Sequence, residues 1–450
     1  MIKFYIALWG CKLYLFLTKM CGKSRSDRVG ILARRIDPDF LNKIKKPELV
    51  IMITGTNGKS TVTHLVNDIF RLTDKKIGFN DWNANLPSGH IRCLLDCVNV
   101  FNKSKKDVAI LECDEVTTCM SIPYIKPNYV IVTNVSRDSI RRNAYPEYIY
   151  KRINDSLAKS LDTFVILNAD DPISSFMGKD NKKAFVSLKN NKTLEPYKNI
   201  SNDFPVCPKC NHEVVYDERY YRHIGKFHCP NCKLKSFKGD YKIEYNDKLI
   251  VNGTKYNALS GSIFNIYNQS QVIALFKELG YSDEFIVEAF EKVNITKSRE
   301  NHVLVNGINV YSRLAKGQNS SAASTVFETL AKDKKQKQIV LVLDEVYDDF
   351  DIDGNETITW LYDTDFEFLN QKHINKVVVV SRIASDYKLR LLLAGVKEEK
   401  IEIVSSTSSV IPKLNLDKKT DIYVLYEVEQ RPVGQKLFDD IVEFIEKEEK

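Results

Sequence analysis

The sequence has no apolar run long enough to cross a bilayer as a helix. Met1–Gly22 is apolar and aromatic, but lysines at positions 3, 12 and 19 interrupt it, whereas a spanning helix needs about 20 apolar residues. No small-residue cleavage site follows, which argues against a secretory signal peptide. Two readings stay open, and both can hold: a helix docked on the first domain, or an amphipathic helix on the membrane surface with its lysines at the headgroups.

The sequence also lacks a concentrated basic arm and a disulfide framework. Lys and Arg number 66 against 59 Asp and Glu, a net charge of +7 spread along the chain. This balance favours anionic ligands such as nucleotides or phospholipid headgroups, and we expect no nucleic-acid partner. Four of the ten cysteines form two CxxC pairs and the other six lie scattered in apolar contexts. We therefore expect a protein of the reducing cytoplasm, peripheral at most to the inner face of the membrane.

The strongest local pattern is Val50–Thr61, in a chain whose 450 residues predict two to four domains. Its apolar run, Val50–Ile53, predicts a buried strand, and a glycine-rich turn and a helical pattern follow. A strand, a glycine loop, Lys-Ser and a helix N-terminus together favour a phosphate-binding loop, with Lys59 as a point charge and Ser60 as a Mg²⁺ ligand. The candidate ATP-binding residues here are Gly55, Thr56, Asn57, Gly58, Lys59, Ser60 and Thr61.

Other predicted strands end in polar side chains. Asp107–Glu115 ends in Glu112, Asp114 and Glu115, which suits a Mg²⁺ site beside the phosphate loop, since hard cations prefer carboxylate oxygens; solvated acids at a strand end are the alternative. Tyr129–Asn134 and Thr163–Pro172 repeat the form. Strands alternating with helical stretches predict an α/β fold with a mostly parallel, doubly wound sheet that binds ligands at the carboxyl ends of its strands.

The sequence pattern changes between residues 205 and 235. Cys207, Cys210, Cys229 and Cys232 form two CxxC pairs that are separated by 18 residues. Four thiolates give closed tetrahedral coordination, so the pattern predicts a structural zinc ribbon inserted in the central domain and without a chemical role. His223 and His228 lie between the pairs, and we expect them to be surface residues rather than ligands.

The remainder predicts a smaller Rossmann-like C-terminal domain. A boundary near Lys297 precedes a predicted strand over Val303–Tyr311; further strands are expected at Gln338–Leu343, Lys376–Ser381 and Ile422–Tyr426, with a helix over Asp386–Ala394. The acid-rich segment Asp344–Asp365 is read either as a functional segment or as a solvated loop. The predicted division is 1–45 for an N-terminal amphipathic helix and lead-in, 46–297 for the ATP-binding domain with the ribbon at 205–235, and 298–450 for the C-terminal domain.

The motifs and their order along the chain resemble those of a known protein family. The short loop TGTNGKST is the form found in the Mur ligase superfamily. With ECDE, TN-x-x-RD, LNADDP, the four-cysteine ribbon, NIYN, SRE and the Asp353–Asp363 segment, the chain resembles the MurT family, the ligase-like subunits of lipid II isoglutaminyl synthases. The ribbon and the acidic Trp segment specify the subfamily, because the phosphate loop alone specifies only the superfamily.

The resemblance implies an ATP-dependent carbon–nitrogen ligase that uses glutamine as its amide donor. ATP would be bound by Gly55–Thr61 and Asn268, and Mg²⁺ by Ser60, Glu112 and Glu115. The γ-phosphoryl group would pass to the D-glutamate α-carboxylate of the lipid II stem peptide, and ammonia from a GatD-type glutaminase in a heterodimer would give D-isoglutamine. Asp353, with Glu356 as the neighbouring alternative, would orient the histidine of the partner's Cys–His pair.

Two other functions remain open at this point. The first is a murein or folylpolyglutamate-type ligase that adds an amino acid and needs no glutaminase; the ribbon and the acidic segment argue against it. The second is a non-catalytic scaffold. The presence of Lys59, Ser60 and Glu115 together argues against that function, because a site without chemistry has no need of all three.

Overall fold

The computed structural model describes residues 1–20, 28–80, 84–137, 145–189, 202–293, 300–315, 319–344, 358–428 and 430–447. The chain divides into two compact units. The first is made of Met1–Ser136, Pro146–Lys198 and Asn202–Thr296, and the second mainly of Lys297–Lys450. None of the helices in the described ranges combines the length and the apolar content that crossing a membrane requires.

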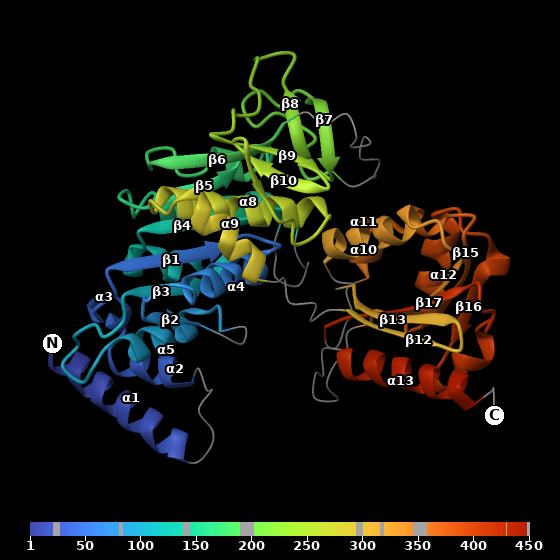
Figure 1. The fold of residues 1–450 in the computed structure, drawn as a ribbon, viewed down its shortest axis with the longest axis horizontal. Coiled ribbons are helices and arrows are strands. Elements are labelled where there is room, and N and C mark those ends of the chain that lie inside the picture. Colours follow the sequence, from blue (N-terminus) through green and yellow to red (C-terminus); the bar gives the residue numbers. More distant parts are fainter. Residues whose placement is uncertain are drawn as a thin grey trace. The chain divides into compact units, whose positions relative to one another are not determined.

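The first unit is built on a nine-stranded sheet of order β11-β10-β9-β6-β5-β4-β1-β3-β2 (Figure 1). From β2 to β9 in this order, neighbouring strands are parallel, whereas β10 and β11 are antiparallel additions at one edge. The strands are β1 (Leu49–Thr54), β2 (Ile77–Phe79), β3 (Val108–Glu112), β4 (Tyr129–Val132), β5 (Phe164–Asn168), β6 (Lys183–Leu188), β9 (Tyr241–Asn246), β10 (Lys248–Val251) and β11 (Thr254–Tyr256). The predicted α/β fold with a mostly parallel sheet is confirmed.

Helices cover both faces of this sheet. On one face, α4 (Lys59–Phe70), α8 (Ile263–Glu278) and α9 (Asp283–Lys292) pack on the side chains of alternate strand residues, such as Ile51 and Ile53 of β1. On the other, Gly78 of β2 lies against Cys97 of α5 (Pro87–Cys97). Burial from both sides explains the continuous apolar run of β1, in which each buried side chain contributes roughly 1.5–3 kcal/mol. The other helical elements in the described part of this unit are η1 (Glu115–Met120), α6 (Ile122–Ile125), α7 (Pro146–Leu157) and η3 (Ser174–Phe176).

The N-terminal segment holds three helices rather than the one helix that was predicted: α1 (Ile2–Met20), α2 (Arg28–Ile36) and α3 (Phe40–Lys43). Phe4, Ala7, Leu8 and Cys11 of α1 are buried. The Phe4 ring lies 5.0 Å from that of Phe40, and α1 and α2 both contact α5. The docked-helix reading of this segment therefore holds.

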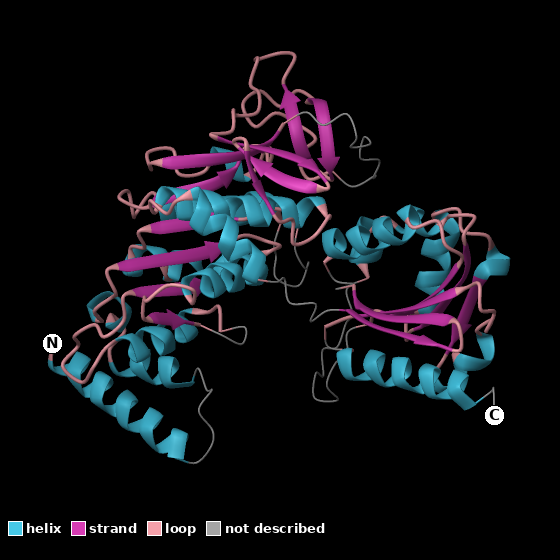
Figure 2. Cartoon of the chain, viewed as in Figure 1, coloured by secondary structure: helices cyan, strands magenta, loops and turns pink. Residues whose placement is uncertain are grey.

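A two-stranded hairpin, β7 (Val215–Tyr221) and β8 (Ile224–His228), carries the cysteine segment and is separate from the nine-stranded sheet (Figure 2). Its tip is not peripheral. Tyr220 and Ile224 belong to the same buried apolar cluster as α4 and α8. The ribbon was predicted to decorate the domain, but its tip is part of the domain core.

The second unit has a six-stranded sheet of order β12-β13-β17-β14-β15-β16, parallel except for β12. Helix α13 (Arg431–Lys447) covers one face, and α10 (Ser320–Lys332), α11 (Thr359–Asp363) and α12 (Ala384–Leu393) cover the other. The strands are β12 (Glu300–Val305), β13 (Ile308–Leu314), β14 (Lys337–Val342), β15 (Ile374–Val380), β16 (Ile401–Val404) and β17 (Asp421–Tyr426). In the described residues, four short 3₁₀ helices complete the unit: η4 (Phe366–Leu369), η5 (Glu398–Lys400), η6 (Thr407–Ser409) and η7 (Ile411–Lys413).

The prediction of a single strand over Val303–Tyr311 is wrong, because this segment contains parts of two strands, β12 and β13. Asn306 and Gly307, with φ of 48° and 83°, turn the chain between β12 and β13. Both residues lie in the left-handed region that a tight two-residue hairpin requires, and Asn-Gly is the pair that adopts it at least cost.

Candidate functional site

The loop Gly55–Thr61 lies at the carboxyl end of β1, between β3 and β4 in the sheet. Gly55 and Gly58 have φ of 124° and 89°, a region that favours glycine. A Cβ at Gly58 would lie 2.5 Å from Oδ1 of Asn268, and one at Gly55 would lie 2.7 Å from the carbonyl oxygen of Asn134. The glycines therefore let the loop pack tightly against its neighbours. The buried Asn268 side chain of α8 lies beside Gly58. The resemblance had implied that Asn268 binds ATP.

Residues that follow β4 hold the loop from one side. The Thr56 N–H donates to the Asn134 carbonyl (2.8 Å), and the Asn134 Nδ2 donates to the Asn57 carbonyl (2.8 Å). The Thr133 hydroxyl also donates to the Asn57 carbonyl (2.7 Å), and the Thr56 hydroxyl donates to the Ser136 carbonyl (3.1 Å). The sequence marked TN-x-x-RD as a motif without giving it this role. Three of these bonds hold loop backbone and the fourth holds the Thr56 side chain, so the loop is pre-formed.

Lys59 opens α4 and turns back into the loop. Its Nζ lies 2.5 Å from the Gly55 carbonyl oxygen and 2.5 Å from Oε2 of Glu115. The Glu115 side chain is buried and the Lys59 side chain is only 13% exposed. The attraction between the two charges is therefore screened less than in a surface pair. Ser60 and Thr61 complete the first turn and are half-buried. N–H groups of a first helical turn have no intrahelical acceptor, and with the helix dipole they favour an anion at this point.

The three acids after β3 are used differently. Glu115 pairs with Lys59, while Oδ1 of Asp114 accepts from the Val116 N–H (3.1 Å) and caps η1. Glu112 is buried to 9% exposure, and its Oε1 lies 3.4 Å from Nδ2 of Asn85. The Glu112 backbone is clamped by Asn80, whose Oδ1 accepts from its N–H (2.7 Å) and whose Nδ2 donates to its carbonyl (2.8 Å). Sequence reasoning missed Asn80 and Asn85, because a distant asparagine carries no local signal.

His90 of α5 also supports the end of β3. Its Nε2 lies 2.8 Å from the Glu112 carbonyl oxygen and its Nδ1 lies 2.8 Å from the Ser121 hydroxyl. A carbonyl oxygen can only accept, so Nε2 carries the proton and the neutral ring accepts at Nδ1. Burial lowers the pKa of His90 to about 4, because charging the ring would place an unsolvated cation in the core.

The lowered pKa of His90 predicts that the protein becomes less stable at acidic pH. Between pH 6.5 and 4 the unfolded chain binds a proton at His90 that the folded chain does not, so the free energy of unfolding drops as the pH falls through this window, on the order of 3 kcal/mol in all. Denaturant unfolding at stepped pH measures it. His90→Gln, whose amide can keep both contacts, should lose this component, whereas His64→Gln, at an exposed position, should retain it. Equal pH dependence in His90→Gln and the unchanged protein would contradict the assignment.

Asp170 and Asp171, after β5, are fully buried and tie elements together. Asp170 accepts from the Tyr267 hydroxyl (2.7 Å) and the Leu188 N–H (2.6 Å), and burial raises its pKa. Asp171 accepts from the Val135 N–H (2.8 Å). These bonds join β4, β6 and α8, so both carboxylates support the segment that holds the loop.

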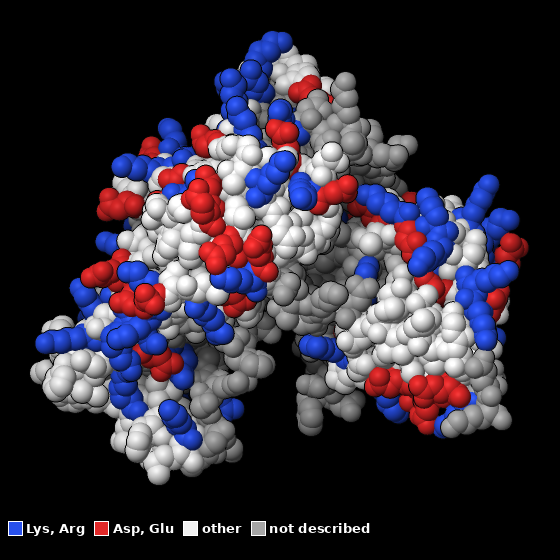
Figure 3. Space-filling model, viewed as in Figure 1, with Lys and Arg blue, Asp and Glu red and all other residues white. Residues whose placement is uncertain are grey.

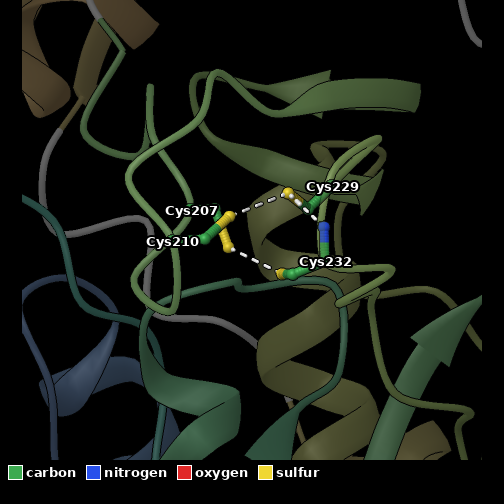
Figure 4. A group of neighbouring side chains, drawn as sticks. All are labelled: Cys207, Cys210, Cys229 and Cys232. Carbon is green, nitrogen blue, oxygen red and sulfur yellow. Dashed lines mark hydrogen bonds between the residues drawn. The ribbon is translucent and has the colours of Figure 1, made fainter.

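The four predicted ribbon cysteines converge (Figure 4). Their Sγ atoms all lie within 4.8 Å of one another; the Cys207–Cys232 and Cys210–Cys229 separations are 3.5 and 3.4 Å. Four thiolates at a Zn–S distance of 2.3 Å would stand about 3.8 Å apart at the corners of a tetrahedron, so the donor set and its spacing fit zinc. Each CxxC pair is followed by a residue with positive φ, Asn211 at 58° and Lys233 at 63°, which gives two matching knuckles. In the described part of the chain no other group of three or more His, Cys, Asp and Glu residues could hold a metal ion.

The hairpin tip corrects one expectation. His223 was predicted at the surface, but it is 1% exposed, with Nε2 at 3.5 Å from Oδ1 of Asp171 and Nδ1 at 3.6 Å from Oδ2 of Asp203. The reason is that the hairpin turn enters the core instead of projecting from it. His228 is half-exposed, as expected, and contacts Asp217. Asp171 also accepts from the Val135 N–H. It therefore connects the hairpin tip at His223 to the segment after β4 that holds the phosphate loop.

The predicted residue Asp353, and its alternative Glu356, lie outside the described residues. Trp360, from the same motif, is buried in the core of the second unit.

Two protein-family descriptions match the chain: Mur ligase middle domain over residues 53–205 and MurT ligase C-terminal over residues 317–428. The lipid II isoglutaminyl synthase (glutamine-hydrolyzing) subunit MurT of Staphylococcus aureus (strain COL) is 27% identical over 401 residues, 87% of this chain and 88% of that protein. The protein with the same description in Streptococcus pneumoniae (strain ATCC BAA-255 / R6) is 24% identical over 403 residues, 88% of each chain.

Among solved structures, a pseudomurein peptide ligase type C from Methanothermus fervidus is similar, with a TM-score of 0.66 and 19% identity over 93% of this chain and 85% of that one. At this identity the similarity establishes the fold and nothing finer.

Proposed function

Because the chain belongs to the Mur ligase superfamily and is MurT-like, we propose that it is the ligase subunit of a lipid II isoglutaminyl synthase. In this role it amidates the D-glutamate α-carboxylate of the lipid II stem peptide, a step in peptidoglycan biosynthesis. The observation that carries the proposal is the pre-formed phosphate loop with its Lys59–Glu115 pair, in a chain that matches MurT subunits along 87% of its length.

ATP with Mg²⁺, when bound, supplies the phosphoryl group that activates the carboxylate. Gly55–Thr61 would cradle the phosphates with backbone N–H groups, Lys59 would donate to them, and Asn268 lies beside the loop at Gly58. Ser60, Glu112 and Glu115 would hold the cation. The Glu115 carboxylate keeps the Lys59 ammonium at the loop, so part of the cost of positioning this charge is met before any ligand binds.

The amide nitrogen would come from a separate glutaminase subunit of the GatD type. Support comes from the relatives, which are named as subunits of glutamine-hydrolyzing synthases. The four cysteines would hold a structural zinc ion, since their geometry leaves no position open for a substrate.

A comparison of ammonium and glutamine as nitrogen donors distinguishes the proposed function from an amino-acid ligase and from a non-catalytic scaffold. With lipid II, ATP and Mg²⁺, the purified chain should release phosphate and amidate the acceptor when given ammonium chloride. With glutamine it should do so only after a GatD-type glutaminase is added. A product that has gained an amino acid instead would establish an amino-acid ligase, and an absence of ATP turnover with either donor would favour a scaffold.

Asp353 offers a test that separates the two half-reactions. Asp353→Asn should lower glutamine-dependent amidation in the complex by about 10²-fold or more, the scale on which loss of a histidine-orienting carboxylate acts. Ammonium-dependent amidation by the same variant should be unchanged. Asp349→Asn, in the same acidic segment, is the matched control, and Glu356→Gln tests the alternative assignment. If Glu356→Gln alone shows the loss, the role belongs to Glu356.

A further inference from the structure

Helix α1 has a second apolar face opposite the one that docks it. Six large side chains on this face are between 51% and 72% exposed: Ile6, Trp9, Leu13, Phe16, Leu17 and Met20. Ile6, Trp9, Leu13, Phe16 and Met20 are three or four residues apart, and Leu17 lies next to Phe16, so the six side chains form one stripe along the helix. A contiguous apolar stripe of this kind is uncommon on a protein surface and marks a binding face.

Basic side chains border the stripe. Helix α1 has three lysines and no acid. At about 100° per residue, Lys3 and Lys19 fall on opposite sides of the stripe, and both are exposed. In Figure 3 the surface at the lower left, where α1 lies, is mainly white with blue side chains beside it. The face therefore has an apolar centre and positive margins.

The orientation of the helix is fixed by polar contacts. The Lys12 ammonium donates to the Val98 carbonyl (2.6 Å) and to that of Leu95, and the Trp9 Nε1 donates to the Val100 carbonyl (2.9 Å). The Trp9 contact brings the loop after α5 beside the stripe. Phe101 in this loop is 70% exposed and continues the apolar surface, and Lys103 and Lys105 beyond it are exposed.

We propose that α1 is an interfacial anchor that seats the first unit on an anionic phospholipid surface. The apolar stripe would enter the boundary between headgroups and acyl chains while Lys3 and Lys19 reach the phosphates. A second copy of the chain fits less well, because a two-fold contact would bring the same positive margins together. This inference goes beyond the proposed reaction and does not rest on it, since it follows from the surface of α1 alone.

The test is co-sedimentation of the full chain with vesicles at low salt, without nucleotide or acceptor. Binding to phosphatidylcholine vesicles that contain phosphatidylglycerol should exceed binding to pure phosphatidylcholine by about tenfold or more. The double variant Leu13→Glu, Phe16→Glu should lower that binding at least about tenfold, because two side chains lose their apolar burial. Leu393→Glu, at a 64% exposed position of α12, is the matched control and should bind as the unchanged chain does.

Trp9 supplies an independent readout of insertion. Anionic vesicles should shift the tryptophan emission to shorter wavelength, and Trp9→Phe should remove the shift while vesicle binding continues. The proposal is overturned if the unchanged chain does not bind anionic vesicles, or if the double variant binds them equally well. It is also overturned if analytical ultracentrifugation shows a dimer that the double variant abolishes, since the stripe would then be a contact between copies. Equal melting temperatures of the variants exclude misfolding as the cause.

Discussion

Replacing Lys59 with alanine will lower ATP-dependent phosphate release by about 10²-fold or more. Lys59 starts α4 at the loop, and its ammonium is held there by the Gly55 carbonyl and by Glu115. A pre-positioned donor at a transferring phosphoryl group acts on charge that develops in the transition state, and loss of one such donor costs about 10²–10³ in rate. Phosphate release with acceptor and ammonium present, measured at saturating ATP, reports the effect on kcat.

Two companion variants make this result interpretable. Lys59→Ala takes away a partner of the buried Glu115 carboxylate, so it should also lower stability. The double variant Lys59→Met, Glu115→Gln removes both charges and should recover stability without recovering turnover. Lys75→Ala changes an exposed lysine just beyond α4 and should leave both unchanged. A Lys59→Ala protein that folds and retains turnover within tenfold of the unchanged chain would contradict the assigned role.

We expect that removing the proposed zinc ion will unfold the cysteine hairpin and weaken the proposed nucleotide site with it. Tyr220, Ile224 and His223 at the tip are buried in the first unit, so loss of the metal exposes core as well as ribbon. Metal binding free energy in such sites is folding free energy, and we expect the Tm to fall by about 10 °C or more, given roughly 2–4 °C per kcal/mol for a unit of this size. Calorimetry after chelation, or on Cys207→Ser, measures the loss.

The effect should reach the phosphate loop through named contacts. His223 lies against Asp171, Asp171 accepts from the Val135 N–H, and the neighbouring Asn134 binds the Thr56 N–H. The KM for ATP should therefore rise in Cys207→Ser and in His223→Ala. Cys119→Ser changes a thiol outside the cluster and His228→Ala changes a half-exposed histidine, so both should behave as the unchanged chain. An unchanged Tm in zinc-free protein would contradict the structural role.

The sequence was most informative where function needs neighbouring residues. A phosphate loop needs consecutive N–H groups, and a knuckle needs two cysteines three apart, so Gly55–Thr61 and the four cysteines could be recognised without a structure. Continuous apolar runs such as Val50–Ile53 predicted strands buried on both faces, and the sheet confirms it.

The remainder depends on contacts between distant residues. Asn80, just after β2, and His90 of α5 both bind the Glu112 backbone, and no spacing rule links them to it. His223 was predicted at the surface, whereas tertiary packing buries it and the adjoining Arg222 and Ile224. The split at Asn306-Gly307 did have a local signal, the Asn-Gly pair, but apolar residues on both sides concealed it.

The most direct test of the proposed function is mass spectrometry of lipid II after incubation with this chain, a GatD-type glutaminase, ATP, Mg²⁺ and glutamine. We expect the mass change for replacement of a carboxyl OH by NH₂, located by fragmentation at the D-glutamate α-carboxylate, and dependent on ATP and on Lys59. Unchanged lipid II, in a reaction where the glutaminase is active and the chain binds ATP, would contradict the proposed function.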